Sequence, residues 1–302
     1  MTLPRVVSLA PSGTDIVAAM GLGRALVGVS HACDHPVARG LPVVTSSPLA
    51  EAELSAGEID ARVRSAVAGG EALYRTDADL LASLAPDVVL GQELCDVCAP
   101  TGSDAAEALP AGADLVLLSG GSLAGLEDDL AAVGAALGVD DRAEQQIAAV
   151  RSAHEHVSER VAGLDRPSVL TLEWGDPPFL GGHWVPELVE VAGGRNVLSQ
   201  AGQPSRRSSW EEIAAADPDT VVFMPCGYGI EQAAAEAREL GARADVAGLR
   251  AVRSGRFWAT DAARLFSRLT PAVVTAAPVL ASLLHPGGFP PVGPRRARQI
   301  TP

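Results

Sequence analysis

The chain has 302 residues, of which 47% are hydrophobic and 20% charged, a composition typical of a folded globular protein with room for two ordinary domains. Its formal net charge of −14 argues against nucleic acid or an anionic membrane surface as partner, because either would need a basic face. All 23 Lys and Arg positions are arginine, which excludes Schiff-base chemistry, pyridoxal phosphate anchoring and a P-loop lysine.

The amino-terminal segment and the apolar runs bear on where the chain resides. Residues 1–17, MTLPRVVSLAPSGTDIV, contain neither the basic region nor the apolar length of a secretory signal, so we interpret them as the first strand. No apolar run approaches the length of about 18 residues that suggests a membrane-spanning helix, and no membrane insertion is expected. We therefore expect a cytoplasmic chain, in which cysteines more often serve as ligands or nucleophiles than as disulfides.

The first half alternates apolar runs of strand length with helical patterns. Strands are predicted at residues 5–12, 26–30, 87–92 and 114–121. Helices are predicted at residues 14–23 and 77–86, the second of which is ended by its terminal proline. Strands of this kind, separated by helices, indicate a parallel sheet that is covered on both faces.

The middle of the chain departs from this alternation. Residues 123–164 form a long helical pattern, in which residues 138–141 mark a break between a first helix and a longer second one. The alternation then resumes, with strands or helices predicted at residues 168–174, 184–194, 209–218, 219–227, 256–261 and 271–286. We expect the Pro- and Arg-rich tail that follows to be frayed.

The two halves are similar to each other. The run RVVSL opens the first half and SVLTL the second, while LLASLAPDVVL in the first half matches EIAAADPDTVV in the second. We therefore predict an α/β fold of two Rossmann-like lobes with parallel sheets, joined by a long connecting helix. The predicted parts are an amino-terminal lobe at 1–122, a connecting helical segment at 123–166 and a carboxyl-terminal lobe at 167–302.

Residues 4–286 resemble a known family, the class III substrate-binding proteins that deliver cobalamin, haem and iron–siderophore complexes to importers. More narrowly, the chain is similar to a leaderless branch described as cobalamin-binding proteins. The motifs that carry the resemblance are H-x-C-D, L-C-x-V-C-A, E-W-x-D-P-P-F, G-H-W-V-P-E, S-R-R-x-S-W-E-E and P-C-G, at residues 31–34, 94–99, 173–179, 182–187, 205–212 and 225–227. The resemblance implies two lobes facing one ligand cleft, and cobalamin, another corrinoid or a related metal-bearing molecule as ligand. The interpretation of the first residues as a strand weighs against a role as the extracellular receptor of an ABC importer.

The four cysteines all follow predicted strands. In parallel α/β sheets, ligands bind outside the carboxyl ends of the strands, and the segments that leave such ends carry Cys33, Cys95, Cys98 and Cys226. Because the fold implied by the resemblance has one cleft, we expect four thiols from distant segments to meet there. Four cysteinate ligands suit tetrahedral zinc or an iron–sulfur cluster, so these cysteines are the predicted metal ligands.

Two other interpretations of the cysteines stay open. Buried cysteines often only pack as small hydrophobic residues, which applies to Cys33 and Cys226 as readily as a ligand role does. The C-x-x-C pair, Cys95 and Cys98, could instead form a redox disulfide. Acidic neighbours such as Glu93 disfavour the low-pKa thiolate that a redox pair needs, so we rank metal binding above it.

Two histidines and two carboxylates are predicted to contact the ligand. His31 and His183 stand in the motifs that lead to the cleft, and neutral imidazole is the commonest protein ligand for metals such as cobalt, iron and zinc. A hydrogen-bonded loop histidine is the alternative, which for His183 is equally well supported. Asp34 and Glu93 flank the cysteines of the first lobe and are included among the predicted ligand contacts.

Aromatic residues are scarce in this chain, and three of them are predicted to line the cleft. Trp174, Trp184 and Tyr228 offer flat rings that can stack on a flat macrocycle and exclude water from it. Trp210, at a predicted helix start, is assigned to packing instead.

The motif SRRSSWEE predicts a helix start of the capping-box type at residues 209–212. Arg206 and Arg207, just before it, could clamp a carboxylate or a phosphate, with a solvated surface position as the alternative for one of them. Glu173 and Asp176 could act as acid–base groups or pair with these arginines. No catalytic residue is assigned.

Two functions from different classes follow. The favoured one is a cytoplasmic binding protein that holds a small metal-bearing ligand, a corrinoid or a similar molecule, between its lobes. The alternative is an enzyme or redox protein in which the four cysteines hold zinc or an iron–sulfur cluster, while Glu173, Asp176 and His183 face a small substrate. The glycine spacings of nucleotide-binding loops and the G-x-S-x-G of serine hydrolases do not occur in the sequence.

Overall fold

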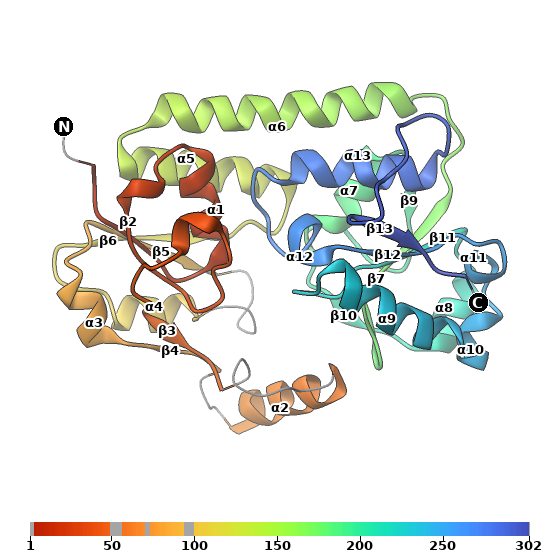
Figure 1. Ribbon diagram of the computed structural model, residues 1–302, viewed down its shortest axis with the longest axis horizontal. Helices are drawn as coiled ribbons and strands as arrows, with labels where there is room; N and C mark the ends of the chain where they lie inside the picture. The colour runs from red at the N-terminus through yellow and green to blue at the C-terminus, as the bar shows by residue number, and fades with distance from the viewer. Residues whose placement is uncertain (1–2, 49–55, 70–72, 94–99, 302) are drawn as a thin grey trace. The chain divides into compact units, whose positions relative to one another are not determined.

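The computed structural model describes residues 3–48, 56–69, 73–93 and 100–301, and Figure 1 shows their course. The chain forms two compact units. The first unit comprises residues 1–120 and 124–148, and the second comprises residues 121–123 and 149–302. Both units are built from α-helices and β-strands, as the sequence predicts. No helix in the described ranges is long and apolar enough to cross a bilayer.

The first unit is built on a parallel sheet with the strand order β2-β1-β5-β6. Its strands are β1 (Val6–Ser8), β2 (Leu26–Val29), β5 (Val88–Gln92) and β6 (Asp114–Leu118). Strand β1 lies in the middle and is fully buried, because Val6 pairs with Leu26 on one side and with Val88 on the other. Short, continuous apolar runs are what a sheet covered on both faces requires. Each of these strands lies within a predicted range, although the range 5–12 extends past β1 into a helix that begins at Pro11.

Helices cover both faces of this sheet (Figure 1). They are α1 (Pro11–Ala19), α3 (Ala78–Ser83) and α4 (Gly102–Glu107). On one face, Val7 and Val89 share a buried cluster with Leu81 of α3. On the other face, α1 packs so closely that a Cβ at Gly13 would lie 2.7 Å from the Ser8 hydroxyl oxygen. The glycine therefore sets how near α1 approaches the sheet.

Several short elements of the first unit have no counterpart in the sequence prediction. They are the 3₁₀ turns Gly23–Ala25 and Pro36–Ala38, helices α2 (Ala56–Gly69) and α4, and the two-stranded antiparallel sheet of β3 (Thr45–Ser46) and β4 (Arg75–Thr76). Just before β3, Val43 forms an isolated parallel bridge with Val29 at the end of β2. This bridge places the start of β3 beside the carboxyl end of β2.

The predicted helical stretch consists of two helices, α5 (Leu123–Leu137) and α6 (Asp140–Val161). Between them, Gly138 adopts a φ of +65°, the left-handed conformation that commonly ends a helix. A Cβ at Gly134 would lie 2.5 Å from the Cβ of Ala143, so glycine there lets the two helices approach closely. The predicted break is confirmed. The division between the compact units falls inside α6, and the boundaries of a separate connecting segment at 123–166 stay a prediction.

The second unit contains a sheet with the order β10-β8-β7-β11-β12-β13, and β9 also pairs with β7. The strands are β7 (Ser168–Gly175), β8 (Pro178–Leu180), β9 (Arg195–Asn196), β10 (Arg206–Arg207), β11 (Thr220–Phe223), β12 (Phe257–Thr260) and β13 (Ala297–Gln299). Strands β9, β7, β11 and β12 pair in parallel, whereas β8, β10 and β13 join antiparallel. The predicted α/β fold with a parallel sheet is confirmed at the centre of this sheet, and a short hairpin and the carboxyl-terminal segment add antiparallel strands at its edges.

The carboxyl-terminal tail is ordered, contrary to the prediction that it is frayed. Ala297 pairs with Thr260 and Gln299 with Trp258, so β13 extends the sheet beyond β12. Ile300 follows and is 3% exposed, in contact with the main core of this unit. Burial of this side chain and backbone pairing to β12 anchor a segment whose composition alone suggests disorder.

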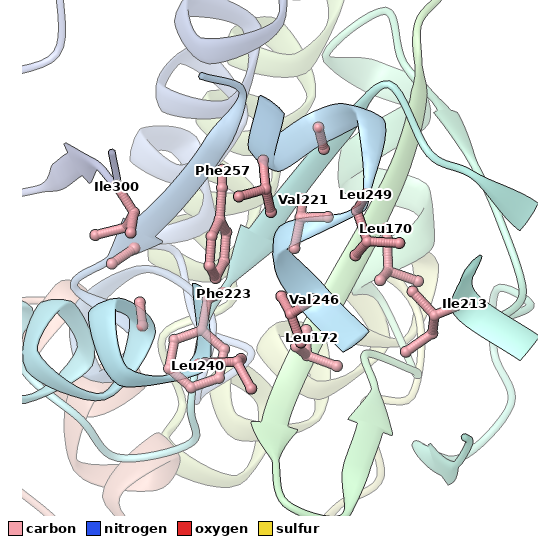
Figure 2. Close-up of a cluster of buried hydrophobic side chains, with 14 of the residues drawn as sticks. Leu170, Leu172, Ile213, Val221, Phe223, Leu240, Val246, Leu249, Phe257 and Ile300 are labelled. Carbon is pink, nitrogen blue, oxygen red and sulfur yellow. The ribbon is translucent and has the colours of Figure 1, made fainter. Parts of the chain in front are cut away.

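Helices cover both faces of the second sheet as well (Figure 1). They are α7 (Val185–Val191), α8 (Trp210–Ala216), α9 (Ile230–Gly241), α10 (Ala244–Ala247), α11 (Arg250–Arg253), α12 (Ala262–Leu265) and α13 (Val273–Leu284). Figure 2 shows the core between the sheet and α8–α11, in which Phe223 and Phe257 are fully buried. This core fixes the strands whose carboxyl ends carry the candidate site.

Candidate functional site

In the first unit, the predicted contact residues follow β2 and β5. His31 and Cys33 are half-buried, whereas Asp34 and Glu93 are exposed. The Glu93 N–H donates to the Leu118 carbonyl at 2.9 Å, which continues the pairing of β5 with β6. These positions agree with the strand-end rule that led to their prediction.

His31 is held by a threonine that the sequence analysis did not single out. The His31 N–H donates to Thr45 Oγ1 at 3.1 Å, and His31 Nδ1 lies 2.7 Å from the same oxygen. The imidazole also lies beside the Tyr74 ring, with 5.7 Å between ring centroids. Burial lowers the pKa of His31 below its usual value, which favours the neutral ring that a metal ligand needs.

Cys33 contacts a residue of α1. Its sulfur lies 3.1 Å from the Thr14 hydroxyl oxygen, and the backbone N–H of Cys33 donates to the Ser30 carbonyl. Nearby, the Ser12 hydroxyl donates to the Gln92 side-chain oxygen at 3.3 Å. The carboxyl ends of β1, β2 and β5 thus gather hydroxyl, thiol, imidazole and amide groups.

The predicted four-cysteine site involves residues of both units and of a segment outside the described ranges. Cys33 belongs to the first unit and Cys226 to the second, while Cys95 and Cys98 lie outside the described residues. Among the described residues, no group of three His, Cys, Asp or Glu side chains is arranged to hold a metal ion. Metal binding by the four cysteines, and a ligand cleft shared by the lobes, stay predictions.

In the second unit, the structure brings Trp174 and Tyr228 together at the ends of the neighbouring strands β7 and β11. Their rings meet edge to face, with centroids 5.5 Å apart and planes at 85°. Both side chains are half-buried, and Tyr228 packs against the main core of the unit. Burial raises the pKa of the Tyr228 phenol, with a smaller effect in the same direction from the Glu236 carboxylate. The pair therefore presents neutral, partly exposed aromatic surface at the strand ends.

The segment after Trp174 forms a hairpin. Strand β8 turns back on β7, so that Trp174 pairs with Phe179. Asp176 lies at the tip, with 86% of its side chain exposed, 3.8 Å from Arg243. Glu173 accepts a hydrogen bond from the Ser205 hydroxyl at 2.9 Å. Asp176 thus lies near Arg243 and Glu173 is bound to Ser205, while the predicted pairing of these carboxylates with Arg206 or Arg207 stays a prediction.

His183 and Trp184 occupy a tightly held loop. His183 has a φ of +53°, and its backbone is fixed because its N–H donates to the Gln203 carbonyl at 2.6 Å while its carbonyl accepts from Gly202 at 2.8 Å. Burial lowers the pKa of His183. Trp184 is only 5% exposed, and its indole N–H is buried without a hydrogen-bond partner. The indole ring of Trp184 thus contributes mainly to packing at the start of α7.

The Arg206 guanidinium is held by hydrogen bonds within the second unit. Its guanidinium donates to both carboxylate oxygens of Glu212, at 2.7 and 3.1 Å, and to the Leu198 carbonyl at 2.7 Å. Arg207 is exposed and lies over the Phe179 ring, 5.7 Å from its centroid. Ser209 accepts from the Glu212 N–H, which confirms it as the N-cap of α8. An anion clamp by these two arginines stays a prediction, and the Arg206 guanidinium is already bound to Glu212.

Trp210 was assigned to packing, and this is confirmed. It is 7% exposed within the main core of the second unit, with the Arg243 guanidinium 5.6 Å from its ring centroid. Cys226 is half-buried on the loop between β11 and α9, next to Gly227, whose N–H donates to the Ser267 hydroxyl at 2.8 Å.

Sequence reasoning missed Thr45 and Tyr74. A signal for Thr45 exists: the apolar run Pro42–Val44 is followed by Thr-Ser-Ser, the change from apolar to polar that marks the other strand ends. No comparable signal precedes Tyr74, which reaches His31 because β4 pairs with β3.

A hollow of about 410 Å³ lies beside α7, but its polar groups are already engaged. Its lining residues are Leu123, Pro186, Glu187, Glu190, Val191, Asn196, Ser199 and Ala201. Glu187 accepts from the Leu123 N–H at 2.7 Å, and Glu190 accepts from the Asn196 N–H and pairs with Arg166. The strand ends are therefore the better candidate for ligand recognition.

Comparisons with known proteins identify the family of the chain. The model of the periplasmic binding protein family matches residues 6–263. No curated protein sequence matches the chain significantly.

Solved structures with the same fold include several periplasmic receptors. A periplasmic heme-binding protein from Pseudomonas aeruginosa is 24% identical, with a TM-score of 0.74, over 100% of this chain and 99% of that one. The periplasmic vitamin B12-binding protein BtuF of Vibrio cholerae is 21% identical, with a TM-score of 0.70, over 93% and 96% of the two chains. The heme-binding protein RhuT from Roseiflexus sp. RS-1 is 21% identical, with a TM-score of 0.68, over 95% and 100%. At these identities the likeness establishes the fold.

Proposed function

The chain belongs to the periplasmic binding protein family, and on that premise we propose that it binds cobalamin, another corrinoid or a related metal-bearing macrocycle such as haem. The observation that carries the proposal is the Trp174–Tyr228 pair at the ends of β7 and β11. Partly exposed aromatic rings at such a position suit a flat, largely apolar ligand.

The ligands of the similar solved structures support the same ligand class. Vitamin B12 and haem differ in metal and ring chemistry, yet both are large flat macrocycles that carry a metal with axial coordination positions. His31 supplies an imidazole at the strand ends of the first unit, where a metal-bearing ligand would find a nitrogen donor.

Equilibrium dialysis of the purified chain against aquocobalamin, aquocobinamide and hemin tests the proposal. We expect near-stoichiometric retention of at least one macrocycle by the wild-type chain. We also expect about tenfold weaker retention by Trp174→Ala, because loss of ring contacts worth about 1.4 kcal/mol weakens binding tenfold. Trp210→Phe is the matched control, since that ring lies in the core, and it should leave retention unchanged. Wild-type chain that retains none of the three would overturn the proposal.

A cytoplasmic location is a further part of the proposal, and with it the view that no ABC importer uses the chain as its extracellular receptor. Fractionation of the native cells, followed by immunoblotting, tests both. We expect the chain in the cytoplasmic fraction, and recovery among exported proteins would instead support an importer as its partner.

A further inference from the structure

From the contacts around His31, we infer that Thr45 fixes this imidazole with its proton on Nδ1, so that Nε2 is the nitrogen that coordinates the metal of the bound macrocycle. The inference rests on the proposed function for the identity of the ligand. It adds the coordinating atom and assigns Thr45 as a positioning residue.

The assignment follows from the hydrogen-bonding capacity of one hydroxyl. Thr45 has a single O–H proton, which it donates to the Ser30 hydroxyl oxygen at 3.1 Å. Its oxygen can therefore only accept from His31, and it does so twice, from the backbone N–H at 3.1 Å and from Nδ1 at 2.7 Å. The Nδ1 atom must then carry the proton of the neutral ring, which leaves the lone pair on Nε2.

The threonine itself is well placed to impose this choice. Thr45 is 5% exposed and Ser30 is 3% exposed, so water does not compete for their hydroxyl groups. The Ser30 oxygen also accepts from the Ala32 N–H at 3.3 Å, which orients it toward Thr45. A buried partner that fixes one ring nitrogen is the arrangement by which proteins orient metal-binding histidines.

Two other histidines show the opposite arrangement. Nδ1 of His35, on the same loop as His31, accepts from the Val37 N–H at 3.2 Å, so its proton lies on Nε2. Nε2 of His285 lies 3.1 Å from the Ala192 carbonyl oxygen, which can only accept, so this nitrogen also carries a proton. His35 is therefore a matched control for His31: same loop, same side chain, opposite tautomer.

The coordination step is a dative bond. The Nε2 lone pair of His31 fills an axial position of cobalt or iron and displaces a weak ligand such as water. No proton is released, because the Nδ1 proton stays in its bond to Thr45, and the oxidation state of the metal does not change. The half-buried ring beside Tyr74 limits the loss of side-chain freedom on binding.

The tautomer can be tested without any ligand. Long-range ¹H–¹⁵N NMR correlation spectra of chain labelled with ¹⁵N-histidine, at neutral pH, distinguish a protonated ring nitrogen from one with a lone pair. We expect His31 to be protonated at Nδ1 and His35 at Nε2. Thr45→Val should convert His31 to a mixture of tautomers, and Thr45→Ser should restore the wild-type pattern. A His31 ring protonated at Nε2, or one that Thr45→Val leaves unchanged, overturns the assignment.

The coordinating atom is tested with two macrocycles, hemin and aquocobinamide, the latter chosen because it lacks a nucleotide base of its own. In reduced cobinamide bound to the chain, electron paramagnetic resonance should show splitting from one axial nitrogen that changes when the histidines carry ¹⁵N. For hemin, the visible spectrum should show an imidazole-ligated iron. Both signatures should be lost in His31→Ala and kept in His35→Ala. Thr45→Val should weaken binding by about tenfold, as is usual for partners of metal ligands.

The possible results separate the two proposals. Binding of either macrocycle without a His31-dependent nitrogen signal overturns the coordination assignment and leaves the proposed function intact. Failure of the wild-type chain to bind either macrocycle overturns the proposed function, and the role of Nε2 as a ligand with it.

Discussion

The two units share β/α alternation, yet their strand ends carry different chemistry. In the first unit, the ends of β2 and β5 present His31, Cys33 and Gln92, which are hydrogen-bonding and metal-binding groups. In the second, the ends of β7 and β11 present the aromatic pair Trp174 and Tyr228. The same β/α alternation can therefore place a metal-donor atom at the strand ends of one unit and a flat apolar surface at those of the other.

The sheets differ in the same way. The first sheet is wholly parallel, and its short strands stop where the polar residues begin. In the second, β7 runs on into a hairpin with β8, and this extension carries Trp174 beyond the point where β11 ends. The aromatic pair thus depends on an antiparallel addition that the first sheet lacks among its described strands.

The largest expected effect concerns the four cysteines. A metal bound by all four would give both units a metal-binding role and would remove the chemical difference between them. The four-cysteine prediction expects anaerobically purified chain to hold near-stoichiometric zinc, or iron with sulfide. Elemental analysis with an absorbance spectrum checks it, and Cys95→Ser/Cys98→Ser should lose the metal entirely. Metal-free, colourless wild-type chain would remove this prediction and leave the comparison as drawn.

Removal of a large core side chain tests whether the second unit has its own core. Phe223→Ala removes a fully buried ring from the core shown in Figure 2. We expect this to lower the free energy of unfolding by about 3–5 kcal/mol. Urea unfolding measures the loss. Hydrogen exchange should show faster opening of β7 and β11, with β1 and β5 little affected, because the lost contacts lie within the second unit. Equal acceleration in all four strands would contradict the account.

A substitution at Gly182 tests how tightly the loop that bears His183 is packed. A Cβ there would lie 2.4 Å from the Ser205 backbone nitrogen and 2.6 Å from the Gln203 carbonyl oxygen, neither of which can move freely. We expect Gly182→Ala to destabilise the chain by about 1–3 kcal/mol, as overpacking does, with a lower melting temperature in calorimetry. Gly229→Ala is the control, because no atom lies within 4 Å of its added Cβ and its φ is −76°. Equal melting temperatures for the two variants would show that this loop is not tightly packed.

The smallest expected effect concerns Glu212 and Arg206. The hydrogen bond from Arg206, aided by Ser208, lowers the pKa of Glu212 from 4.5 to about 2 in the folded chain. A carboxyl group whose pKa is lower in the folded than in the unfolded state stabilises the fold above pH 4.5, and this contribution is lost as the pH falls toward 2.

Because 43% and 40% of these two side chains are exposed, the contribution should stay below about 1 kcal/mol and shrink in high salt. Urea unfolding of wild-type and Glu212→Gln chain, above and below pH 4.5, measures it. The two should converge at acidic pH. A constant difference between them at every pH would contradict the ion-pair explanation.

The parallel core of each unit could be predicted from the sequence, and the edges could not. Continuous apolar runs such as 87–92 and 219–223 identify buried strands, because only a covered sheet needs them. Strand β13 carries no such run: its ARQ sequence is ordered by pairing to β12 and by burial of Ile300. The hairpin after β7 was not predicted, because its return strand β8 is only three residues long and begins with a proline.

For the candidate site, too, the positions at strand ends could be predicted and the contacts between side chains could not. The strand-end rule placed His31, Trp174 and Tyr228 correctly at carboxyl ends, because that rule depends only on the order of strands and helices. The rule could not reveal the hydrogen bond between His31 and Thr45. This bond forms because the bridge between Val43 and Val29 places Thr45 beside the end of β2. Nor could residue type alone show that Arg206 is bound to Glu212.

We propose that the carboxyl strand ends recognise a metal-bearing macrocycle, and hydrogen–deuterium exchange with and without the macrocycle retained in dialysis tests this proposal. We expect slower exchange at residues 31–34, 174–184 and 226–228 when the ligand is bound. Slowing confined to the opposite ends of the strands, at residues 217–219 and 254–256, or to the hollow beside α7, would contradict it.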